Sequence, residues 1–349
     1  MMTQIFKQVP KVIFGKDSIS RIKELIPEDL QNDILFIVDD SLPELPILKI
    51  VNEDRIIHYP ASLGEPKTIQ IDRICADFQT KNKKLPTAIV GIGGGSTMDV
   101  SKAISVMLTN VGSSSDYQGW DLINMPGIFK VGIPTISGSG SESSRTAVLM
   151  GPKKKFGINS DFSMFDSILL DSILTRSVPD EQKFHTGMDC FIHCVESIEG
   201  TMINDLSKSY ASKALELCRK SFLEHYDEDE MMVASYLGGV SIVNSEVGIC
   251  HALSYGLSLE LGLRHGIANC IAFNVLDDYY GNHVKDFRRM VEKYNISLPK
   301  NVCCDLNDNK LNRMIDMTMK MERPLTNALG RSWRKTLTKA SIKDLYLSM

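Results

Sequence analysis

The chain has 349 residues, 43% of them hydrophobic, so it can bury a large core but exceeds the usual length of one domain. Its 39 Lys and Arg residues nearly balance 43 Asp and Glu residues, and the basic residues form no block along the sequence. We therefore expect neither nucleic-acid nor membrane partners. The N-terminus lacks an apolar signal segment, and the eight cysteines form no C-x-x-C pair. These features favour a cytoplasmic protein with reduced thiols that acts on small molecules.

The first half alternates strand and helix patterns. Five short runs rich in β-branched residues predict strands, at Lys11–Gly15, Ile34–Asp40, Arg55–Tyr59, Thr87–Gly93 and Val131–Thr135. Between them, Lys67–Lys81 and Ser96–Asn110 place apolar residues three and four positions apart, as helices packed on a sheet do. This alternation predicts an α/β domain with a Rossmann-like parallel sheet.

The second half has a different pattern. From about Val178 the strand signals fade, and long helical stretches follow, such as Asp205–Tyr226 and Glu230–Leu261. The polar segment Gly151–Phe162 precedes this change. We therefore expect an α/β dinucleotide-binding domain over residues 1–163 and an all-helical metal-binding and catalytic domain over residues 164–349.

A glycine-rich loop, Gly91–Asp99, directly follows the apolar strand Ala88–Val90 and opens a helix. Glycines let the backbone approach a pyrophosphate, while the free N–H groups and the dipole at a helix start favour an anion. Because the spacing differs from G-x-G-x-x-G, a tight turn without a ligand remains the alternative. The predicted phosphate contacts are Gly93, Gly94, Gly95 and Ser96.

A second loop of small residues, Pro134–Glu142, also follows a predicted strand. Its hydroxyl groups can bond a ribose, a nicotinamide amide or a phosphate, although an isolated loop of this composition is more often merely flexible. The carboxyl ends of parallel strands converge on a shared crevice. Two such loops therefore predict one dinucleotide site.

Four residues form a candidate metal centre. Asp189 and His193 are four positions apart, which stacks them on one face of a helix, and His251 and His265 could close the site from downstream. One carboxylate and three imidazoles suit Fe²⁺ or Zn²⁺. We expect all four to meet around a single ion.

Other readings of this segment stay open. Asp189 and His193 could form only an exposed helix pair, and His185, one turn earlier, could compete as a ligand. A thiolate metal site formed by Cys190 and Cys194 is an alternative. However, one of these cysteines must face away from the site if Asp189 and His193 face it. Buried, unreactive thiols are the alternative for both cysteines.

These motifs resemble the iron-dependent, or group III, alcohol dehydrogenase family over essentially the whole chain. The residues that carry the resemblance are the loops Gly93–Asp99, with Lys102, and Pro134–Glu142, the segments Lys155–Ile158 and Thr186–His193, and the pair His251 and His265, all in the family's order. The resemblance implies a dehydroquinate synthase-like architecture, a homodimer, NAD(P) as cofactor, and Asp189, His193, His251 and His265 as ligands of a divalent metal. It places the dinucleotide contacts at Gly94, Gly95, Ser96, Asp99, Thr135, Ser139 and Lys155, with Asp39 or Asp40 near the adenosine ribose.

Within the family, three segments are similar to members that oxidise the C8 hydroxyl of the acidic sugar 3-deoxy-D-manno-octulosonate (Kdo) in lipopolysaccharide biosynthesis: Asp116–Asp121, Lys154–Phe162 and Thr186–Ser197. This similarity implies a metal-bound alkoxide, hydride transfer to a nicotinamide and an aldehyde product that an aminotransferase could convert to 8-amino-Kdo. Tyr255 stands where many members have a second histidine, and Arg264 replaces the usual proline before His265. Both are candidate assisting residues.

A carboxylated substrate requires a cationic partner, for which Arg145, Lys155 and Arg264 are the candidates by motif position. The electron acceptor is open between dioxygen and NAD(P). Three other functions also remain open: an NAD(P)-dependent dehydrogenase of another primary alcohol or polyol, a relative of dehydroquinate synthase or glycerol dehydrogenase, and a non-catalytic nucleotide-binding regulator.

Overall fold

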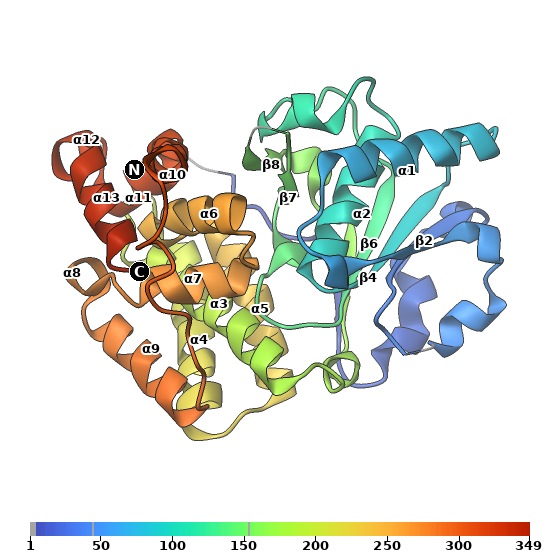
Figure 1. Ribbon diagram of the computed structural model, residues 1–349. Helices are drawn as coiled ribbons and strands as arrows, with labels where there is room; N and C mark the ends of the chain where they lie inside the picture. The colour runs from blue at the N-terminus through green and yellow to red at the C-terminus, as the bar shows by residue number, and fades with distance from the viewer. Residues whose placement is uncertain (1–4, 44, 153) are drawn as a thin grey trace. The chain divides into compact units, whose positions relative to one another are not determined.

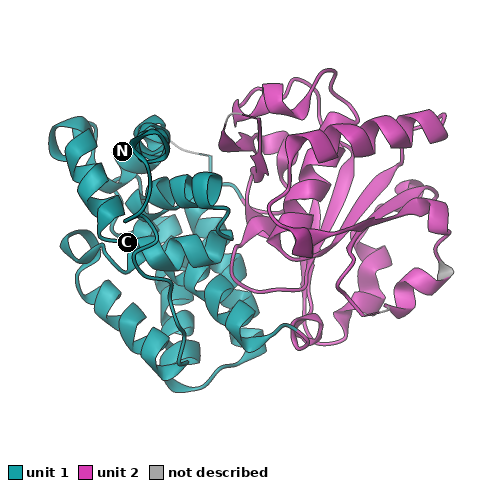
Figure 2. Ribbon diagram, viewed as in Figure 1, with its two compact units in different colours: residues 1–7, 178–349 teal, residues 8–177 magenta. Residues whose placement is uncertain are grey.

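The computed structural model describes residues 5–43, 45–152 and 154–349 (Figure 1). It divides into two compact units, one comprising Gln8–Ser177 and the other Val178–Met349 together with the residues up to Lys7 (Figure 2). The division falls later than the predicted boundary after residue 163. The reason is that Ser167–Leu170, an apolar run beyond that boundary, forms a strand of the first unit's sheet.

The Gln8–Ser177 unit contains the predicted Rossmann-like sheet. Its order is β1-β9-β6-β4-β2-β3, and every adjacent pair is parallel. The strands are β1 (Lys11–Phe14), β2 (Ile34–Asp39), β3 (Ile56–Tyr59), β4 (Ala88–Gly93), β6 (Phe129–Pro134) and β9 (Ser167–Leu170). The central strand β4 is buried along its whole length, as expected of a parallel strand covered on both faces.

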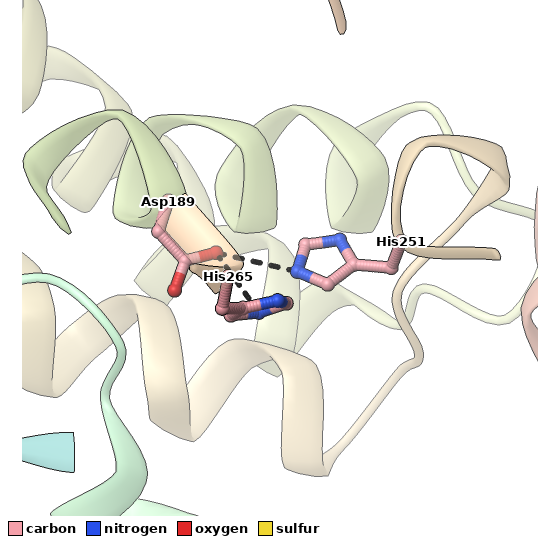
Figure 3. Close-up of side chains that lie close together, drawn as sticks. All are labelled: Asp189, His251 and His265. Atoms are coloured by element: carbon pink, nitrogen blue, oxygen red, sulfur yellow. Dashed lines mark ion pairs between the residues drawn. The ribbon is translucent and has the colours of Figure 1, made fainter. Parts of the chain in front are cut away.

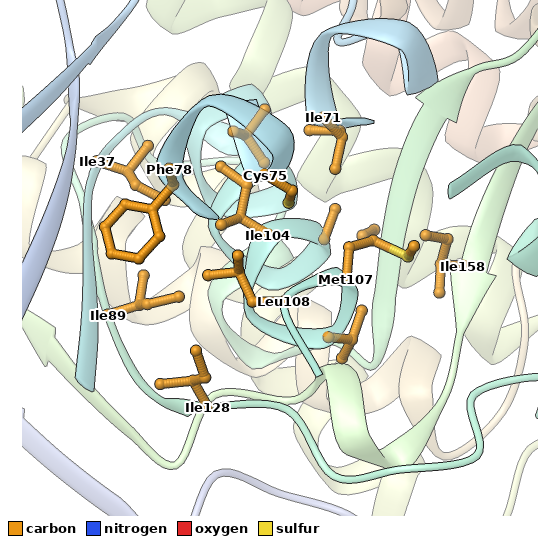
Figure 4. Packing of buried hydrophobic residues seen from close by; sticks show 14 of the residues in the cluster. Ile37, Ile71, Cys75, Phe78, Ile89, Ile104, Met107, Leu108, Ile128 and Ile158 are labelled. Carbon is orange, nitrogen blue, oxygen red and sulfur yellow. The ribbon is translucent and has the colours of Figure 1, made fainter. Parts of the chain in front are cut away.

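Two helices pack against this sheet. In α1 (Thr68–Lys81), Ile71, Cys75 and Phe78 follow helical spacing and face the core, whereas α2 (Gly95–Met107) is buried along nearly its whole length. Figure 4 shows side chains of both helices packed with Ile37 and Ile89 of the sheet. The remaining helical segments here are short 3-10 turns, at Ser18–Leu25, Glu28–Leu30, Pro46–Ile50, Glu53–Arg55, Ala61–Leu63, Ser114–Tyr117, Ser141–Ser143, Asp161–Ser163 and Ser172–Thr175.

A small second sheet belongs to the same unit. Its order is β5-β8-β7, formed by β5 (Gly119–Trp120), β7 (Thr146–Met150) and β8 (Lys155–Asn159), with β7 and β8 antiparallel. The polar segment Gly151–Phe162 therefore contains a strand and does not end the unit; Lys153 within it lies outside the described residues.

The described part of the second unit is all-helical, as predicted. Its helices are α3 (Asp180–Ile198), α4 (Asp205–Arg219), a π-helical turn at Lys220–Glu224, α5 (Glu228–Val243), α6 (Ile249–Leu261), α7 (His265–Phe273), α8 (Asp277–Tyr280), α9 (Asn282–Lys293), α10 (Asp308–Lys320), α11 (Glu322–Leu329), α12 (Trp333–Thr336) and α13 (Lys339–Leu347). Among the described residues, none of the helices combines the length and apolar character that a membrane crossing requires.

The predicted helical stretch Glu230–Leu261 is interrupted, because α5 ends at Val243 and α6 begins at Ile249. Tertiary contacts form this break. The Asn327 amide donates to the carbonyl oxygens of Glu246 and Val247, and the Asn244 amide donates to that of Lys7 at 2.7 Å. The break makes a new helix N-terminus just before His251.

Candidate metal centre and dinucleotide loops

The four predicted metal ligands lie on three helices of one unit. Asp189 and His193 are one turn apart on α3, His251 lies in the first turn of α6, and His265 is the first residue of α7. Figure 3 shows the side chains of Asp189, His251 and His265 converging on one point. Asp189, His193 and His251 are buried, and His265 is partly exposed.

One carboxylate oxygen of Asp189 faces all three candidate histidine ligands. Asp189 Oδ1 lies 3.5 Å from His193 Nε2, 3.3 Å from His251 Nε2 and 3.6 Å from His265 Nε2. Ligand distances of roughly 2.0–2.2 Å place the donor atoms of a tetrahedral ion about 3.4 Å apart. The spacing and the mixture of one oxygen with imidazole nitrogens therefore fit a divalent first-row metal.

The donor atoms of Asp189, His251 and His265 all lie within 4.8 Å of one another, and His193 is outside this mutual group. The His193 ring nevertheless stacks on the His251 ring, with 4.6 Å between centroids. The structure thus brings the four predicted residues to one place, with three of them in the tightest arrangement. Their role as ligands remains a prediction.

The site is strongly polarised. Burial by itself raises the pKa of the Asp189 carboxyl, but the three surrounding imidazoles outweigh it and hold that pKa well below its ordinary value. Burial lowers the pKa of His251, yet Glu196 and Asp189 raise it to about 9. Two buried carboxylates therefore face this imidazole, which creates an electrostatic demand for a cation.

Asn269 and Glu196 are parts of the site that sequence reasoning missed. The Asn269 amide donates to Asp189 Oδ1 at 2.7 Å, and its own Oδ1 is buried without a hydrogen-bond partner among the described residues. Glu196 Oε2 lies 2.5 Å from His251 Nδ1. A helical-spacing signal existed for both, since Asn269 is four positions after His265 and Glu196 three after His193.

Residues that could have competed for the metal lie elsewhere. His185 Nε2 is 3.6 Å from Glu181, and its Nδ1 is 3.7 Å from Cys270 Sγ. Cys190 Sγ is 3.5 Å from Cys218 Sγ, so this thiol packs on α4. The group of side chains close enough to share an ion, among the described residues, contains neither His185 nor a cysteine.

The two candidate assisting residues flank His265. The ring of Tyr255, one turn after His251 on α6, packs edge-on against the His265 ring with 5.8 Å between centroids. Arg264 is exposed and immediately precedes α7. Both belong to the same unit as the candidate metal centre.

The two glycine-rich loops lie against each other, as their positions after adjacent strands predict. The Thr135 N–H donates to the Gly93 carbonyl oxygen at 2.9 Å, and a Cβ placed on Gly95 would lie 2.7 Å from Ser139 Oγ. The partly exposed Gly95 and Ser96 form the start of α2. An added Cβ would force the Ser139 side chain to shift, and the loop leaves the first amides of a helix available, which suits an anionic group.

Several predicted dinucleotide contacts have internal partners. Asp99 Oδ1 accepts from Ser141 Oγ at 2.5 Å, its Oδ2 accepts from the Val148 N–H at 3.0 Å, and Lys102 Nζ is 3.5 Å away. Asp99 and Lys102 thus tie the start of α2 to the second loop.

Two further predicted contacts also have partners within the unit. Lys155, which is 1% exposed, pairs with Glu65 at 3.1 Å. Asp39, at the end of β2, accepts from the backbone N–H and the hydroxyl of Ser41. Contacts of all these residues with a dinucleotide remain predictions.

The three candidate partners of a substrate carboxylate lie in different surroundings. Arg145 is buried in unit Gln8–Ser177, where it pairs with Asp121 and, at 2.8 Å, with Asp161. Lys155 is held by Glu65, and only Arg264 lies beside a candidate metal ligand.

Comparison with known families and proteins gives a consistent result. The profile of the family described as iron-containing alcohol dehydrogenase matches residues 10–172, and that of the C-terminal region of the Fe-containing alcohol dehydrogenase family matches residues 183–327. The chain is 35% identical over 208 residues to sulfoacetaldehyde reductase of Bilophila wadsworthia, covering 56% of this chain and 54% of that protein. It is 26% identical over 271 residues to alcohol dehydrogenase 4 of Schizosaccharomyces pombe, covering 74% and 64%. The chain thus spans about half to two thirds of the length of these curated relatives.

Solved structures share the fold over nearly the whole chain. An iron-containing alcohol dehydrogenase from Thermotoga maritima superposes with a TM-score of 0.82 at 22% identity, covering 99% of this chain and 98% of that one. Sulfoacetaldehyde reductase from Bifidobacterium kashiwanohense, in complex with NAD⁺, gives a TM-score of 0.79 at 20% identity, with 100% and 99% covered. The predicted fold class is confirmed, and the expectation of a divalent metal and a nicotinamide dinucleotide agrees with these findings and with the donor set on α3, α6 and α7.

Proposed function

The chain belongs to the iron-containing alcohol dehydrogenase family, and from this premise we propose that it is an oxidoreductase of alcohols or aldehydes. It exchanges a hydride between a nicotinamide dinucleotide and the terminal carbon of a primary alcohol that carries an acidic group. The observation that carries this proposal is the position of Asp189 Oδ1 within 3.3–3.6 Å of three imidazole Nε2 atoms.

The proposed chemistry requires a positively charged centre for the substrate oxygen. A bound divalent metal supplies Lewis acidity, which lowers the pKa of an alcohol and polarises an aldehyde. The ionised Asp189 contributes one negative charge and the neutral imidazoles contribute none, so the occupied centre keeps a net positive charge. Asp189, His193, His251 and His265 would hold the ion, and Tyr255 would support the ring of His265 through its edge-on contact.

The dinucleotide is proposed to bind at the loops of the Gln8–Ser177 unit. The amides at the start of α2 would receive the pyrophosphate, and the hydroxyls of Ser96, Thr135 and Ser139 are suited to the remaining polar groups. The NAD⁺ complex of the structurally similar reductase supports this cofactor. Dioxygen as the final acceptor is retained as the alternative suggested by the similarity to Kdo-oxidising members.

For the substrate, we propose recognition of an anion by Arg264. Arg264 is exposed and directly precedes the candidate ligand His265, whereas Arg145 and Lys155 belong to the other unit. The C8 hydroxyl of Kdo is the candidate favoured by the three sequence segments. Sulfoacetaldehyde and its alcohol, isethionate, are a second candidate, favoured by the 35% identical relative. Both compounds combine a terminal oxygen function with an acidic group.

The test is a substrate comparison with metal-loaded protein. Kdo, isethionate and n-butanol are each incubated with NAD⁺, with NADP⁺ or with dioxygen alone, and the reduced dinucleotide, trapped aldehyde and hydrogen peroxide are measured. We expect turnover of an acidic alcohol with a dinucleotide, and an increase in KM for that alcohol, but not for butanol, in the variant Arg264→Gln. Oxidation of butanol alone would contradict the acidic substrate, and failure with every substrate and acceptor would favour the non-catalytic nucleotide-binding regulator.

A further inference from the structure

Glu196 is a fully buried carboxylate on α3, one turn beyond His193, and it is 1% exposed. Its Oε1 accepts hydrogen bonds from the Cys250 N–H at 2.7 Å and the Tyr280 hydroxyl at 3.0 Å. Its Oε2 lies 2.5 Å from His251 Nδ1. The first two bonds anchor one oxygen at the N-terminus of α6, where a negative charge is favourable, and leave the other oxygen for His251.

His251 thus has a carboxylate at each ring nitrogen, with Glu196 at Nδ1 and Asp189 Oδ1 3.3 Å from Nε2. A neutral imidazole carries one proton, and the nitrogen that holds it cannot bind a metal. The shorter contact is the one to Glu196. It therefore favours the proton on Nδ1 and leaves the Nε2 lone pair directed at Asp189 and the candidate metal centre.

His193 provides a contrast within the same site. Its Nδ1 is buried and has no hydrogen-bond partner among the described residues, so no carboxylate fixes its ring from behind. Of these two histidines, His251 alone has its orientation and its tautomer set by a neighbouring acid.

We propose that Glu196 is a positioning residue of the metal centre, which orients the His251 ring and holds the tautomer that presents Nε2 to the ion. This inference rests on the proposed function, since it concerns the same centre. In this role Glu196 acts through its contact with His251. Such outer carboxylates typically change metal affinity by about 10- to 100-fold when they are removed.

The variant Glu196→Gln tests the proposal sharply because glutamine keeps the shape but has only one acceptor atom. If its Oε1 serves the Cys250 N–H and the Tyr280 hydroxyl, its NH₂ group faces Nδ1 and forces the proton onto Nε2. We expect the affinity for Co²⁺, measured by competition with a chelator, to fall about 10- to 100-fold. The visible spectrum of bound Co²⁺ should also change, since its ligand geometry changes.

A matched control is Glu246→Gln. Glu246 is also a buried glutamate of this unit, but it pairs with Arg323 at 3.0 Å and contacts none of the four candidate ligands in the described hydrogen bonds and ion pairs. We expect this variant to bind Co²⁺ within about threefold of the unsubstituted protein, with an unchanged spectrum. An equal loss of affinity in both variants, or no loss in Glu196→Gln, would overturn the proposal.

A measurement on the unsubstituted protein tests the proposal even if Glu196→Gln does not fold. Nitrogen NMR of ring-labelled histidine, recorded on the metal-free protein at a pH high enough to keep the His251 imidazole neutral and assigned with His251→Gln, reports which nitrogen carries the proton. We expect Nδ1–H, and an Nε2–H tautomer would refute the role of Glu196. If the unsubstituted protein binds no Co²⁺, the proposed function fails, while the tautomer still decides the role of Glu196.

Discussion

The two candidate sites of this molecule are built from different materials. The dinucleotide loops are made mainly of backbone, with glycines that let Gly95 approach Ser139 and place helix amides at the surface. The metal centre is made of side chains on three helices, each supported by a second side chain or a packed ring. The first kind of site should fail when an atom is added, and the second when a functional group is removed.

Removing a ligand should have the largest effect. In Asp189→Ala we expect metal affinity to fall by about 100- to 1000-fold, because one of four ligands is lost from a centre whose total binding free energy is about 10–16 kcal/mol. Chelator competition measures this loss. The control Glu181→Gln changes an acid on the same helix that pairs with His185, and it should bind metal normally. Normal binding by Asp189→Ala would remove the metal centre from its proposed place.

Removing the cation of the buried ion pair between Lys102 and Asp99 should lower the free energy of unfolding. Lys102 is 0% exposed and donates to Ser141, Ser144 and the Thr146 carbonyl oxygen, so Lys102→Met leaves Asp99 buried without its cation. We expect the free energy of unfolding to fall by about 3–5 kcal/mol in denaturant titrations. Lys81→Met, at the exposed end of α1, is the control and should change it little. The folded fraction of Lys102→Met should keep its metal affinity, which would show that the metal centre does not depend on this ion pair.

A pair of glycine substitutions separates loop geometry from ligand approach. A Cβ on Gly93 would lie 2.5 Å from Thr97 Oγ1 and 2.9 Å from Asp39 Cβ, whereas one on Gly94 would meet only the flexible end of Ile136 at 3.1 Å. We expect Gly93→Ala to lose about 1–3 kcal/mol of folding free energy and Gly94→Ala to lose less. Dinucleotide affinity, measured by calorimetry, should fall in both. Unchanged affinity in Gly94→Ala would mean that no phosphate approaches this loop.

The smallest effect is expected at a thiol. Cys190 is adjacent to Asp189 but packs on Cys218, so Cys190→Ala should leave metal affinity within about twofold and cost about 1 kcal/mol of folding free energy through the small void. A loss of affinity comparable to that of Asp189→Ala would instead revive the thiolate site as the rival.

The sequence predicted what depends on local pattern. Sequence pattern located the helices α1 and α2 and the strands β1, β2, β3, β4 and β6, of which β4 and β6 precede the two loops. The four-residue spacing of Asp189 and His193 placed them on one helix face. It could not predict the interruption between α5 and α6, because Asn327 and Lys7, which bond to that segment, are distant in the chain. Strand β9 was missed for a similar reason, since its four residues form a strand only by pairing with β1 and β6.

The candidate site shows the same limit. The donor types of the metal centre could be read from single residues, but the supporting roles of Glu196 and Asn269 depend on contacts between helices. Likewise, the assignment of Asp99 and Lys155 as dinucleotide contacts came from motif position alone. Their pairing with Lys102 and Glu65 became visible only with the fold.

The pair of hydrogen bonds between Lys7 and Asn244 has a consequence for folding during biosynthesis. The two residues exchange hydrogen bonds in both directions, each 2.7 Å long, across 237 positions of the chain. During translation, Lys7 can therefore form these bonds only after the whole α/β unit and the helical unit as far as Asn244 have been synthesised. The helical unit consequently cannot acquire this contact by folding one stretch at a time, and a fragment beginning at Val178 would lack it altogether.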